Sequence, residues 1–270
     1  MKITAKKKFG QNFLKDSAVL NKIIKSMPNT SNLVVEIGPG LGDLTQKLLE
    51  KKDVIAFEID RDLCQLLKRK FNQEIEKGRL KLICDDVLDH WEQTLLNQEY
   101  DLIANLPYYV ATNILLKALQ DRKCKNVLVM LQKEVADKFS AKVGDRNFSS
   151  LAVLSQSVGE VKKLFNVPPN AFDPPPKVDS AVLLIRKEKN LEDKGFMEFL
   201  KRAFKQPRKT LLKNLSQHYE KELLRSLFDS LGIASTIRPH EASTSIYHRL
   251  YEMLKERIDE SAIPKPSKKR

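Results

Sequence analysis

The sequence predicts an α/β protein, in which a Rossmann-like, mostly parallel sheet precedes a small all-helical domain. Up to about residue 187, short runs rich in β-branched and aliphatic residues alternate with longer amphipathic stretches. Strands separated by helices in this way are typical of βαβ units. Beyond that point only helical periods occur. We therefore expect a first domain over 1–187, a helical domain over 188–262 and a basic tail over 263–270.

The elements of the first domain follow one another in a regular order. Helical periods occupy 41–51 and 61–71, between runs that have the length of buried strands. The segment 166–179 contains five prolines, which exclude a helix, and "SAVLLIR" after it predicts a last strand. The other predicted strands are 32–37, 53–60, 79–86, 100–107 and 126–132.

The helical domain is predicted from the periods at 196–204, 223–228 and 246–258. Basic residues exceed acidic ones more strongly here than in the first domain, and the final "SAIPKPSKKR" is typical of a solvated tail. Over the whole chain, 48 Lys and Arg face 35 Asp and Glu, a net charge of +13. Such a surplus favours nucleic acid as a partner, although an anionic membrane or simple solubility gives the same balance.

The cysteines and histidines indicate no metal centre. Cys64, Cys84 and Cys124 are an odd number without C-x-x-C spacing, which argues against a disulfide framework and against a zinc knuckle. No apolar run approaches the roughly 20 residues of a membrane helix, and the first residues lack the apolar segment of a signal peptide. We expect a cytoplasmic protein that does not enter a membrane.

A glycine loop follows the first predicted strand in "VVEIGPGLGDLTQKLL". Gly38 and Gly40 allow a tight turn and a close approach of a ligand to the backbone. The dinucleotide fingerprint G-x-G-x-x-G is not completed, because its sixth position is Asp43. Glu36, two residues before the loop, would repel a pyrophosphate but suits the cationic end of S-adenosylmethionine, which carries no phosphate.

Two further carboxylates end the next two predicted strands. Glu58 lies about 20 residues after the glycine loop, at the position where an acid can hold the two hydroxyls of a ribose. Asp86 ends the third strand and can accept a hydrogen bond from an adenine amino group. Ligands of parallel sheets bind outside the carboxyl ends of the strands. The pattern therefore predicts an S-adenosylmethionine site.

The run "LIANLPYYV" ends a strand on an amide, a proline and an aromatic ring. The Asn105 side-chain oxygen and the Leu106 carbonyl can accept from the two N–H groups of an exocyclic amine, which favours localising its lone pair toward a methyl donor. Pro107 stiffens this geometry. Tyr108 offers a face on which a base can stack, whereas Tyr109 is expected to pack.

Five segments together resemble the small-subunit (16S) rRNA adenine-N6,N6-dimethyltransferases. Asn-Leu-Pro-Tyr looks like the N6-adenine form of the amino-methyltransferase motif, and "EIGPGLGDLT" looks like the family's glycine loop. The resemblance covers most of the chain, with one departure at Ala242, where a leucine would be expected. The other matching segments are "KKKFGQNFLKD" (6–16), "FDPPPKVDSAV" (172–182) and "FKQPRKTLLKNL" (204–215).

The resemblance implies specific roles. Phe172 would sandwich the flipped target adenine against Tyr108, and Asn105 would border both donor and acceptor. Gln11, Asn12 and Leu14 would close over S-adenosylmethionine. The product would be N6,N6-dimethyladenosine at two adjacent adenosines near the 3′ end of 16S rRNA, within an assembling 30S subunit. We expect a monomer whose phosphate contacts are Lys6, Lys7, Lys8, Lys201, Arg202, Lys205, Arg208 and Lys209.

Three alternatives remain at this point. A large-subunit rRNA adenine N6-methyltransferase of the antibiotic-resistance type shares the glycine loop and the Asn-x-Pro-Tyr arrangement. A ribosome-assembly factor without catalysis could retain the same fold. A DNA adenine methyltransferase is a weaker option, because no segment has the size of a target-recognition domain.

Overall fold

The computed structural model describes Lys6, residues 11–191 and residues 193–262. It divides the chain into two compact units, the first of 1–140 and 158–191 and the second of 141–157 and 192–270. The predicted boundary near 187 thus lies close to the observed one, but 141–157 belong to the helical unit and not to the first domain. This segment was assigned wrongly because its apolar stretch is continuous in sequence with the βα pattern around it.

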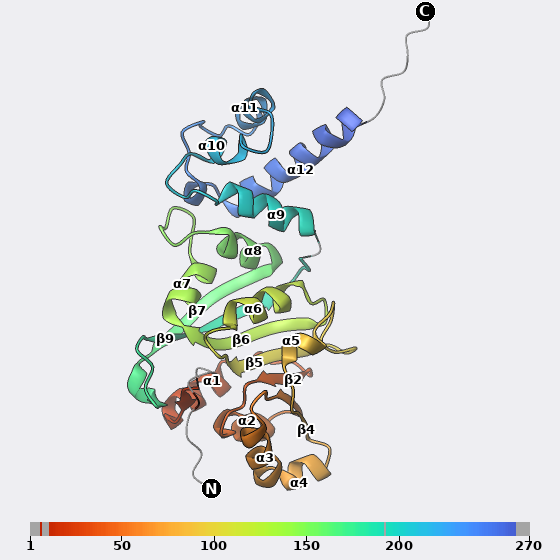
Figure 1. Ribbon diagram of the computed structural model, residues 1–270, viewed down its shortest axis with the longest axis vertical. Coiled ribbons are helices and arrows are strands. Elements are labelled where there is room, and N and C mark those ends of the chain that lie inside the picture. Colours follow the sequence, from red (N-terminus) through yellow and green to blue (C-terminus); the bar gives the residue numbers. More distant parts are fainter. Residues whose placement is uncertain (1–5, 7–10, 192, 263–270) are drawn as a thin grey trace, which may run out of the picture. The chain divides into compact units, whose positions relative to one another are not determined.

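The first unit contains a seven-stranded sheet of order β4-β3-β2-β5-β6-β9-β7 (Figure 1). Neighbouring strands from β4 to β6 are parallel, whereas β9 is antiparallel to both β6 and β7. This confirms the predicted mostly parallel sheet. The strands are β2 (Leu33–Ile37), β3 (Val54–Phe57), β4 (Leu80–Ile83), β5 (Tyr100–Asn105), β6 (Cys124–Gln132), β7 (Gly159–Val167) and β9 (Ser180–Lys187).

Strand β7 was not predicted, since its run "GEVKKLFNV" has exposed lysines and lies at the sheet edge. A second, two-stranded sheet was also missed. It pairs β1 (Phe13–Leu14) with β8 (Phe172–Asp173), 158 positions apart by the Leu14–Phe172 register. Pairs of two residues leave no periodicity in a sequence, so only the folded chain reveals them.

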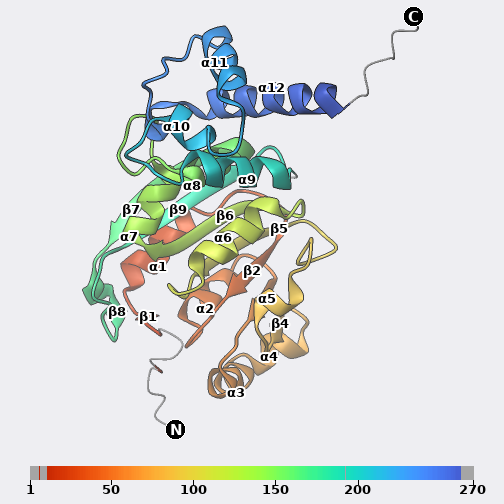
Figure 2. The same cartoon turned by 45° about the horizontal axis from the view of Figure 1, so that its top comes forward.

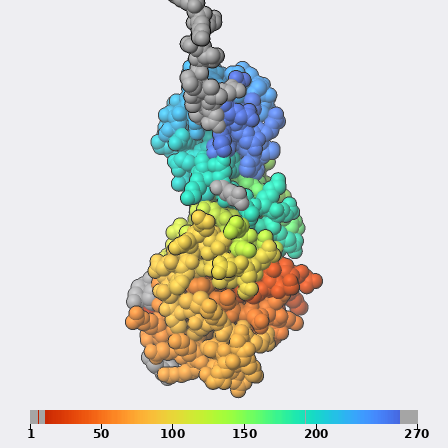
Figure 3. Space-filling model, turned by 90° about the vertical axis from the view of Figure 1, so that its right-hand side faces the viewer, coloured from red at the N-terminus to blue at the C-terminus, as the bar shows by residue number. Residues whose placement is uncertain are grey.

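The helices of the first unit lie between successive parallel strands in the chain, as crossover connections require. In the two ribbon views α6 lies along β6 and α7 lies beside β7 (Figures 1 and 2). On the face shown in Figure 3, the orange and yellow part of the chain, which includes α3 to α5, forms a continuous surface. The helices are α1 (Ser17–Lys25), α2 (Asp43–Leu49), α3 (Arg61–Lys70), α4 (Asn72–Glu76), α5 (Val87–His90), α6 (Ala111–Gln120) and α7 (Lys133–Ser140), with a 3-10 turn, η2 (Pro169–Ala171).

The central strands are buried on both faces, which explains their uninterrupted apolar runs. Val35, Ala56 and Leu102 are fully buried on three adjacent strands. Cys64 of α3 and Cys84, which follows β4, are joined as a disulfide with a Cα–Cα distance of 5.9 Å. The expectation of unpaired cysteines is therefore wrong for this pair, because the crossover from α3 to β4 brings together two residues that are 20 apart in sequence.

The helical unit is built around aromatic rings. The Phe204 and Tyr247 ring centroids lie 5.2 Å apart, and the His248 ring stacks on Phe196 at 4.3 Å. Within the described residues, no helix is long and apolar enough to cross a membrane. The unit comprises most of α8 (Ser150–Val158), with α9 (Lys194–Ala203), α10 (Leu211–Leu215), α11 (Lys221–Ser230), η3 (Pro239–Glu241) and α12 (Thr244–Ala262).

A buried carboxylate ties together the loops opposite the carboxyl ends of the strands. Asp121, fully buried after α6, accepts hydrogen bonds from Trp91 Nε1 at 2.9 Å, from the Leu95 amide at 2.8 Å and from the Tyr100 hydroxyl at 2.7 Å. Its other oxygen accepts from the Lys123 amide at 2.7 Å. Without this side chain, the buried Trp91 indole and Leu95 amide would lose these partners.

We expect Asp121→Ala to lower the free energy of unfolding by about 3 kcal/mol or more, since each unpaired buried donor costs about 1–3 kcal/mol. Urea unfolding, followed by circular dichroism and by the fluorescence of Trp91, the one tryptophan of the chain, measures this loss. Asp53→Ala is the control, because Asp53 is exposed and pairs with Arg79 at 3.2 Å on the surface, an interaction of about 0–1 kcal/mol. Equal losses in the two variants would contradict the assignment.

Candidate active site

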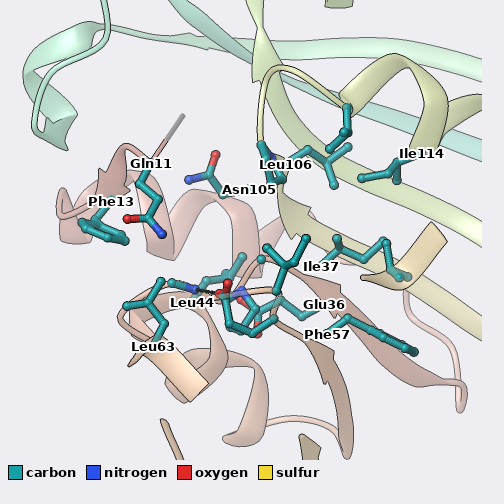
Figure 4. A pocket seen from close by; sticks show the side chains of 18 of the residues that line it. Gln11, Phe13, Glu36, Ile37, Leu44, Phe57, Leu63, Asn105, Leu106 and Ile114 are labelled. Atoms are coloured by element: carbon teal, nitrogen blue, oxygen red, sulfur yellow. Dashed lines mark hydrogen bonds between the residues drawn. The ribbon is translucent and has the colours of Figure 1, made fainter. Parts of the chain in front are cut away.

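A cavity lies at the carboxyl ends of β2, β3, β4 and β5 in the first unit. Figure 4 shows Gln11, Glu36 and Asn105, from three separate segments of the chain, around it. All predicted donor-site residues line this cavity, as does the predicted acceptor motif. These residues are Gln11, Asn12, Leu14, Glu36, Gly38, Gly40, Glu58, Asp86, Asn105, Leu106, Pro107 and Tyr108.

The glycine loop has a conformation and a packing that require glycine. Gly38 has φ of 70°, and a Cβ there would lie 3.3 Å from the Pro107 ring. Gly40 has φ of 60°, and a Cβ there would meet the Phe13 ring at 3.0 Å. Residues with a Cβ rarely adopt this left-handed region. The loop therefore lies against both the acceptor motif and the N-terminal segment.

Glu58 is buried just beyond β3, with both oxygens held by backbone amides. Its carboxylate accepts from the Gly40 amide at 3.1 Å and from the Asp60 amide at 3.0 Å. Burial raises the pKa of Glu58, and these two hydrogen bonds oppose that rise. The side chain thus links the glycine loop to the start of α3 and lines the cavity at the position predicted for the donor ribose.

Glu36 is buried within β2, where its carboxyl accepts a hydrogen bond from the Thr45 hydroxyl at 2.6 Å. Burial raises the pKa of Glu36 to about 8, although the Thr45 hydrogen bond lowers it. A positive charge entering the cavity would favour the ionised form of this carboxyl. Glu36 can therefore respond to a cationic ligand.

The N-terminal segment is anchored to the start of α3. Gln11 donates to Asp60 at 2.9 Å, and its side-chain oxygen accepts from the Lys6 amide at 2.7 Å. The Lys6 ammonium pairs with Asp60 at 2.7 Å and with Asp62 at 2.6 Å. Burial alone would raise the pKa of Asp60, but the bonds from Lys6 and Gln11 outweigh burial and lower it.

These ion pairs give Lys6 partners within the protein. Lys6 was expected to contact an RNA phosphate, and here its ammonium donates hydrogen bonds to two carboxylates, which raise the pKa of Lys6. The pairs connect Lys6 to the start of α3. The sequence shows a basic run but not the acids that fold against Lys6, so this pairing was not predicted. Lys7 and Lys8 lie outside the described residues.

The acceptor motif leaves β5 in a fixed orientation. Asn105 Nδ2 donates to the Asn12 carbonyl at 3.4 Å, which orients the amide, and the Leu106 amide donates to the Met130 carbonyl of β6 at 2.9 Å. Leu106 is buried, and Tyr108 is half-buried. The motif is thus connected to the N-terminal segment on one side and to the sheet on the other.

Phe172 does not occupy the predicted place. It is 4% exposed in β8, packs in the core with Leu14 and Val167, and is absent from the described residues that line the cavity. Its pairing with Leu14 buries the ring, so the predicted sandwich around an adenine is not formed by this conformation. Phe172 instead anchors the loop beneath the N-terminal segment.

Three cavity residues were missed or misjudged. Phe13 lines the cavity and packs on Gly40, and Asp85 adds a carboxylate next to Asp86. Tyr109 was expected to pack, but it is 57% exposed at the cavity, and partial burial, followed by the negative charges of Asp86 and Glu58, raises its pKa. The doubled tyrosine in "PYY" was the available signal, but its two rings cannot be told apart without the backbone.

The lining of the cavity fits S-adenosylmethionine and opposes a phosphate-bearing ligand. Among the described residues that line it are five acidic side chains and no lysine or arginine, the acids being Glu36, Asp43, Glu58, Asp85 and Asp86. Such a surface attracts a sulfonium and an ammonium and repels a pyrophosphate. If the donor is bound there, Glu58 and Asp86 would hold its ribose and adenine, and it would supply a methyl group activated by positive charge.

In the helical unit, the segment after α9 carries the predicted phosphate contacts. Lys205, Arg208 and Lys209 are exposed, as is Lys201, which pairs with Glu198 at 3.3 Å. Arg202 is half-buried beside the Tyr219 ring.

A buried amide shapes this basic segment. The Asn214 side chain accepts from the Gln206 amide at 2.8 Å and donates to the carbonyl of Gln206 at 3.0 Å and to that of Thr210 at 3.1 Å. These bonds fix the loop between α9 and α10, so that its basic side chains project from a defined backbone.

We expect the raised pKa of Glu36 to make stability depend on pH. The folded protein holds this proton up to about pH 8, whereas the unfolded chain releases it near 4.5. Its stabilising contribution is therefore present below pH 4.5 and is lost as pH rises toward 8, by up to about 1.4 kcal/mol per pH unit. Glu36→Gln should show a smaller loss of urea midpoint between pH 5.5 and 7.5 than the unmodified protein. Glu50→Gln, an exposed change, is the control, and parallel profiles for Glu36→Gln and the unmodified protein would contradict the assignment.

Comparisons with known proteins identify the family of the chain. The model of the family described as "Ribosomal RNA adenine dimethylase" matches residues 2–256. A protein of Sulfurimonas denitrificans named "Ribosomal RNA small subunit methyltransferase A" is 58% identical over 252 residues, 93% of this chain and 94% of that protein. A protein of the same name from Aliarcobacter butzleri is 52% identical over 94% of this chain and 97% of its own length.

A solved structure shows the same fold. The crystal structure of a dimethyladenosine transferase from Plasmodium falciparum is 26% identical, with a TM-score of 0.75 over 90% of this chain and 98% of that one. Together the matches confirm the resemblance to small-subunit rRNA adenine dimethyltransferases over the large-subunit alternative. The chain belongs to the ribosomal RNA adenine dimethylase family and is an S-adenosylmethionine-dependent methyltransferase.

Proposed function

We propose that this enzyme transfers methyl groups from S-adenosylmethionine to the N6 amino groups of two adjacent adenosines near the 3′ end of 16S rRNA. The product is N6,N6-dimethyladenosine, formed in the cytoplasm on an assembling 30S subunit by a monomeric enzyme. The observation that carries the proposal is the cavity itself, in which an acid-lined donor half adjoins the motif Asn105 to Tyr108. The names of the relatives support the choice of small-subunit rRNA.

The acceptor half of the cavity orients the target amino group and does not act as an acid or a base. The lone pair of an adenine amino group is delocalised into the ring, and hydrogen bonds to both N–H groups favour its localisation. The Asn105 oxygen is one acceptor, because its amide nitrogen is bonded to Asn12. The Leu106 carbonyl is the second acceptor. The hydrogen bond from the Leu106 N–H to the Met130 carbonyl of β6 holds this part of the backbone in place. Positioning of the amino nitrogen in line with the methyl group of the donor then provides most of the rate enhancement.

A base inside a helix cannot reach this cavity, so the target adenosine must be unstacked and turned outward. Tyr108 receives its face, since it lines the cavity and is half-buried. Because Phe172 is buried in the core, stacking in this arrangement depends on Tyr108 alone among the two predicted rings. The exposed loop after α9, with Lys205, Arg208 and Lys209, contacts phosphates of the rRNA.

The first prediction concerns the acceptor. Labelled S-adenosylmethionine is incubated with small subunits that lack the adenine methyls, with naked large-subunit rRNA and with duplex DNA, and the labelled nucleosides are identified. We expect N6,N6-dimethyladenosine from small subunits alone. Label from large-subunit rRNA would move the enzyme to the antibiotic-resistance type. Donor binding without any label would indicate an assembly factor.

Asn105→Ala should lower the methylation rate at least about 100-fold, the scale of losing a preorganised hydrogen-bonding group at the reacting centre. Donor binding, measured by calorimetry, should remain detectable because Glu58 and Asp86 are intact. Asn113→Ala, an exposed asparagine on α6, is the matched control and should retain full activity. An unchanged rate in Asn105→Ala would refute the acceptor geometry.

The double change Arg208→Ala and Lys209→Ala should weaken binding to small subunits and flatten its salt dependence. Each lost phosphate contact should reduce the slope of log K against log[salt] by about 1. Lys221→Ala with Arg225→Ala removes the same charge from exposed positions on α11 and is the control. Equal slopes for the two double variants would exclude this loop as a specific contact.

A further inference from the structure

The apolar strand β9 begins with a buried polar side chain, which is bonded to the acceptor motif. Ser180 is the first residue of β9, is fully buried, and pairs with Gln132 of β6 and Val167 of β7. The next five residues of the strand, Ala181 to Ile185, are apolar and also buried. A hydroxyl in such a place is costly unless it forms a hydrogen bond. Its partner is the Tyr108 hydroxyl at 2.6 Å.

This bond completes a two-ended support for the Tyr108 ring. At its backbone end, the preceding Leu106 amide is bonded to Met130 of β6, and Pro107 restricts the chain. At its far end, the phenol oxygen is bonded to Ser180 of β9, the strand next to β6. Both supports therefore come from adjacent strands of one rigid sheet. Tyr108 also lines the cavity, so its ring is within reach of a ligand there.

We propose that Ser180 is a positioning residue for methyl transfer, whose hydroxyl holds the Tyr108 ring in the plane against which the target adenine stacks. The inference rests on the proposed function, because it concerns the acceptor side of the same reaction. It also assigns a role to the segment 172–182, from which sequence analysis selected Phe172. The residue of this segment that acts on the acceptor site is Ser180, through Tyr108.

The physical benefit is a preorganised stacking surface. A phenol ring attached only at Cα can rotate about two side-chain bonds, and each orientation turns the stacked base relative to the methyl donor. Transfer requires the amino nitrogen to lie in line with the donor. A ring that is free to adopt several orientations therefore lowers turnover. The donor half of the cavity makes no hydrogen bond to Ser180 or to Tyr108 among the described contacts, and its affinity should not depend on this bond.

The test is a double-mutant cycle with Ser180→Ala and Tyr108→Phe, each of which removes the hydrogen bond while the ring remains. Methylation kinetics are measured with whichever of the three acceptors the unmodified enzyme labels, together with the donor dissociation constant and the urea midpoint. Each single change should lower kcat/KM for the acceptor up to about tenfold, the scale of one neutral hydrogen bond. Donor affinity should stay within about twofold, and the double variant should be no slower than either single one.

Ser140→Ala is the matched control, since its hydroxyl is bonded to the Ala136 carbonyl in α7, away from the cavity. It should leave all kinetic constants unchanged. If Ser180→Ala does not fold, Tyr108→Phe still removes the same bond from the cavity side and must show the same loss. Full activity in Tyr108→Phe, or multiplicative losses in the double variant, would overturn the positioning role.

Labelling of the three acceptors by the unmodified enzyme tests the proposed function separately from this inference. Label in large-subunit rRNA alone would refute the proposed substrate, and the cycle would then be run on that acceptor with the same expected result. No label on any acceptor would refute both. A Ser180→Ala variant that loses stability and donor affinity together, with an unchanged acceptor step, would show a merely structural serine.

Discussion

The parallel pairing of β2, β3, β4 and β5 is the constraint on which the remaining structure depends. Strands that run the same way end at the same edge of a sheet, so the polar residue after each one reaches a common cavity. Glu36 near the end of β2, Glu58 just beyond β3 and Asn105 at the end of β5 meet there for this reason. The apolar interiors of the same strands supply the burial that holds the edge rigid.

Burial of charge gives this edge its chemical character. Carboxyl groups removed from water are costly to ionise, and in the cavity they are hydrogen-bonded locally, Glu36 by the Thr45 hydroxyl and Glu58 by two backbone amides. A cationic ligand relieves that cost, whereas an anionic one increases it. The basic net charge of the chain lies elsewhere, in part on the exposed loop of the helical unit. In the proposed reaction, the donor and the RNA would thus be attracted by surfaces of opposite sign.

Segments far apart in sequence support the acceptor motif. The N-terminal segment reaches Asn105 through the Asn12 carbonyl and is fastened by Lys6 to the start of α3, while β9 reaches Tyr108 through Ser180. In the proposed reaction, both supports would act by limiting the orientations of Asn105 and Tyr108, so that groups that are only weak bases serve catalysis by position.

Local patterns were enough to predict the α/β class, the glycine loop, the acids at the strand ends and the Asn-Leu-Pro-Tyr motif, because each depends on local periodicity or on the backbone preferences of single residues. Only the folded chain shows that 141–157 join the helical unit, that Lys6 faces two acids, that Phe172 is buried and that Ser180 is bonded to Tyr108. Those outcomes are pairings between distant segments. They depend on which charged and aromatic side chains come into contact in the folded chain, and local sequence patterns do not contain this information.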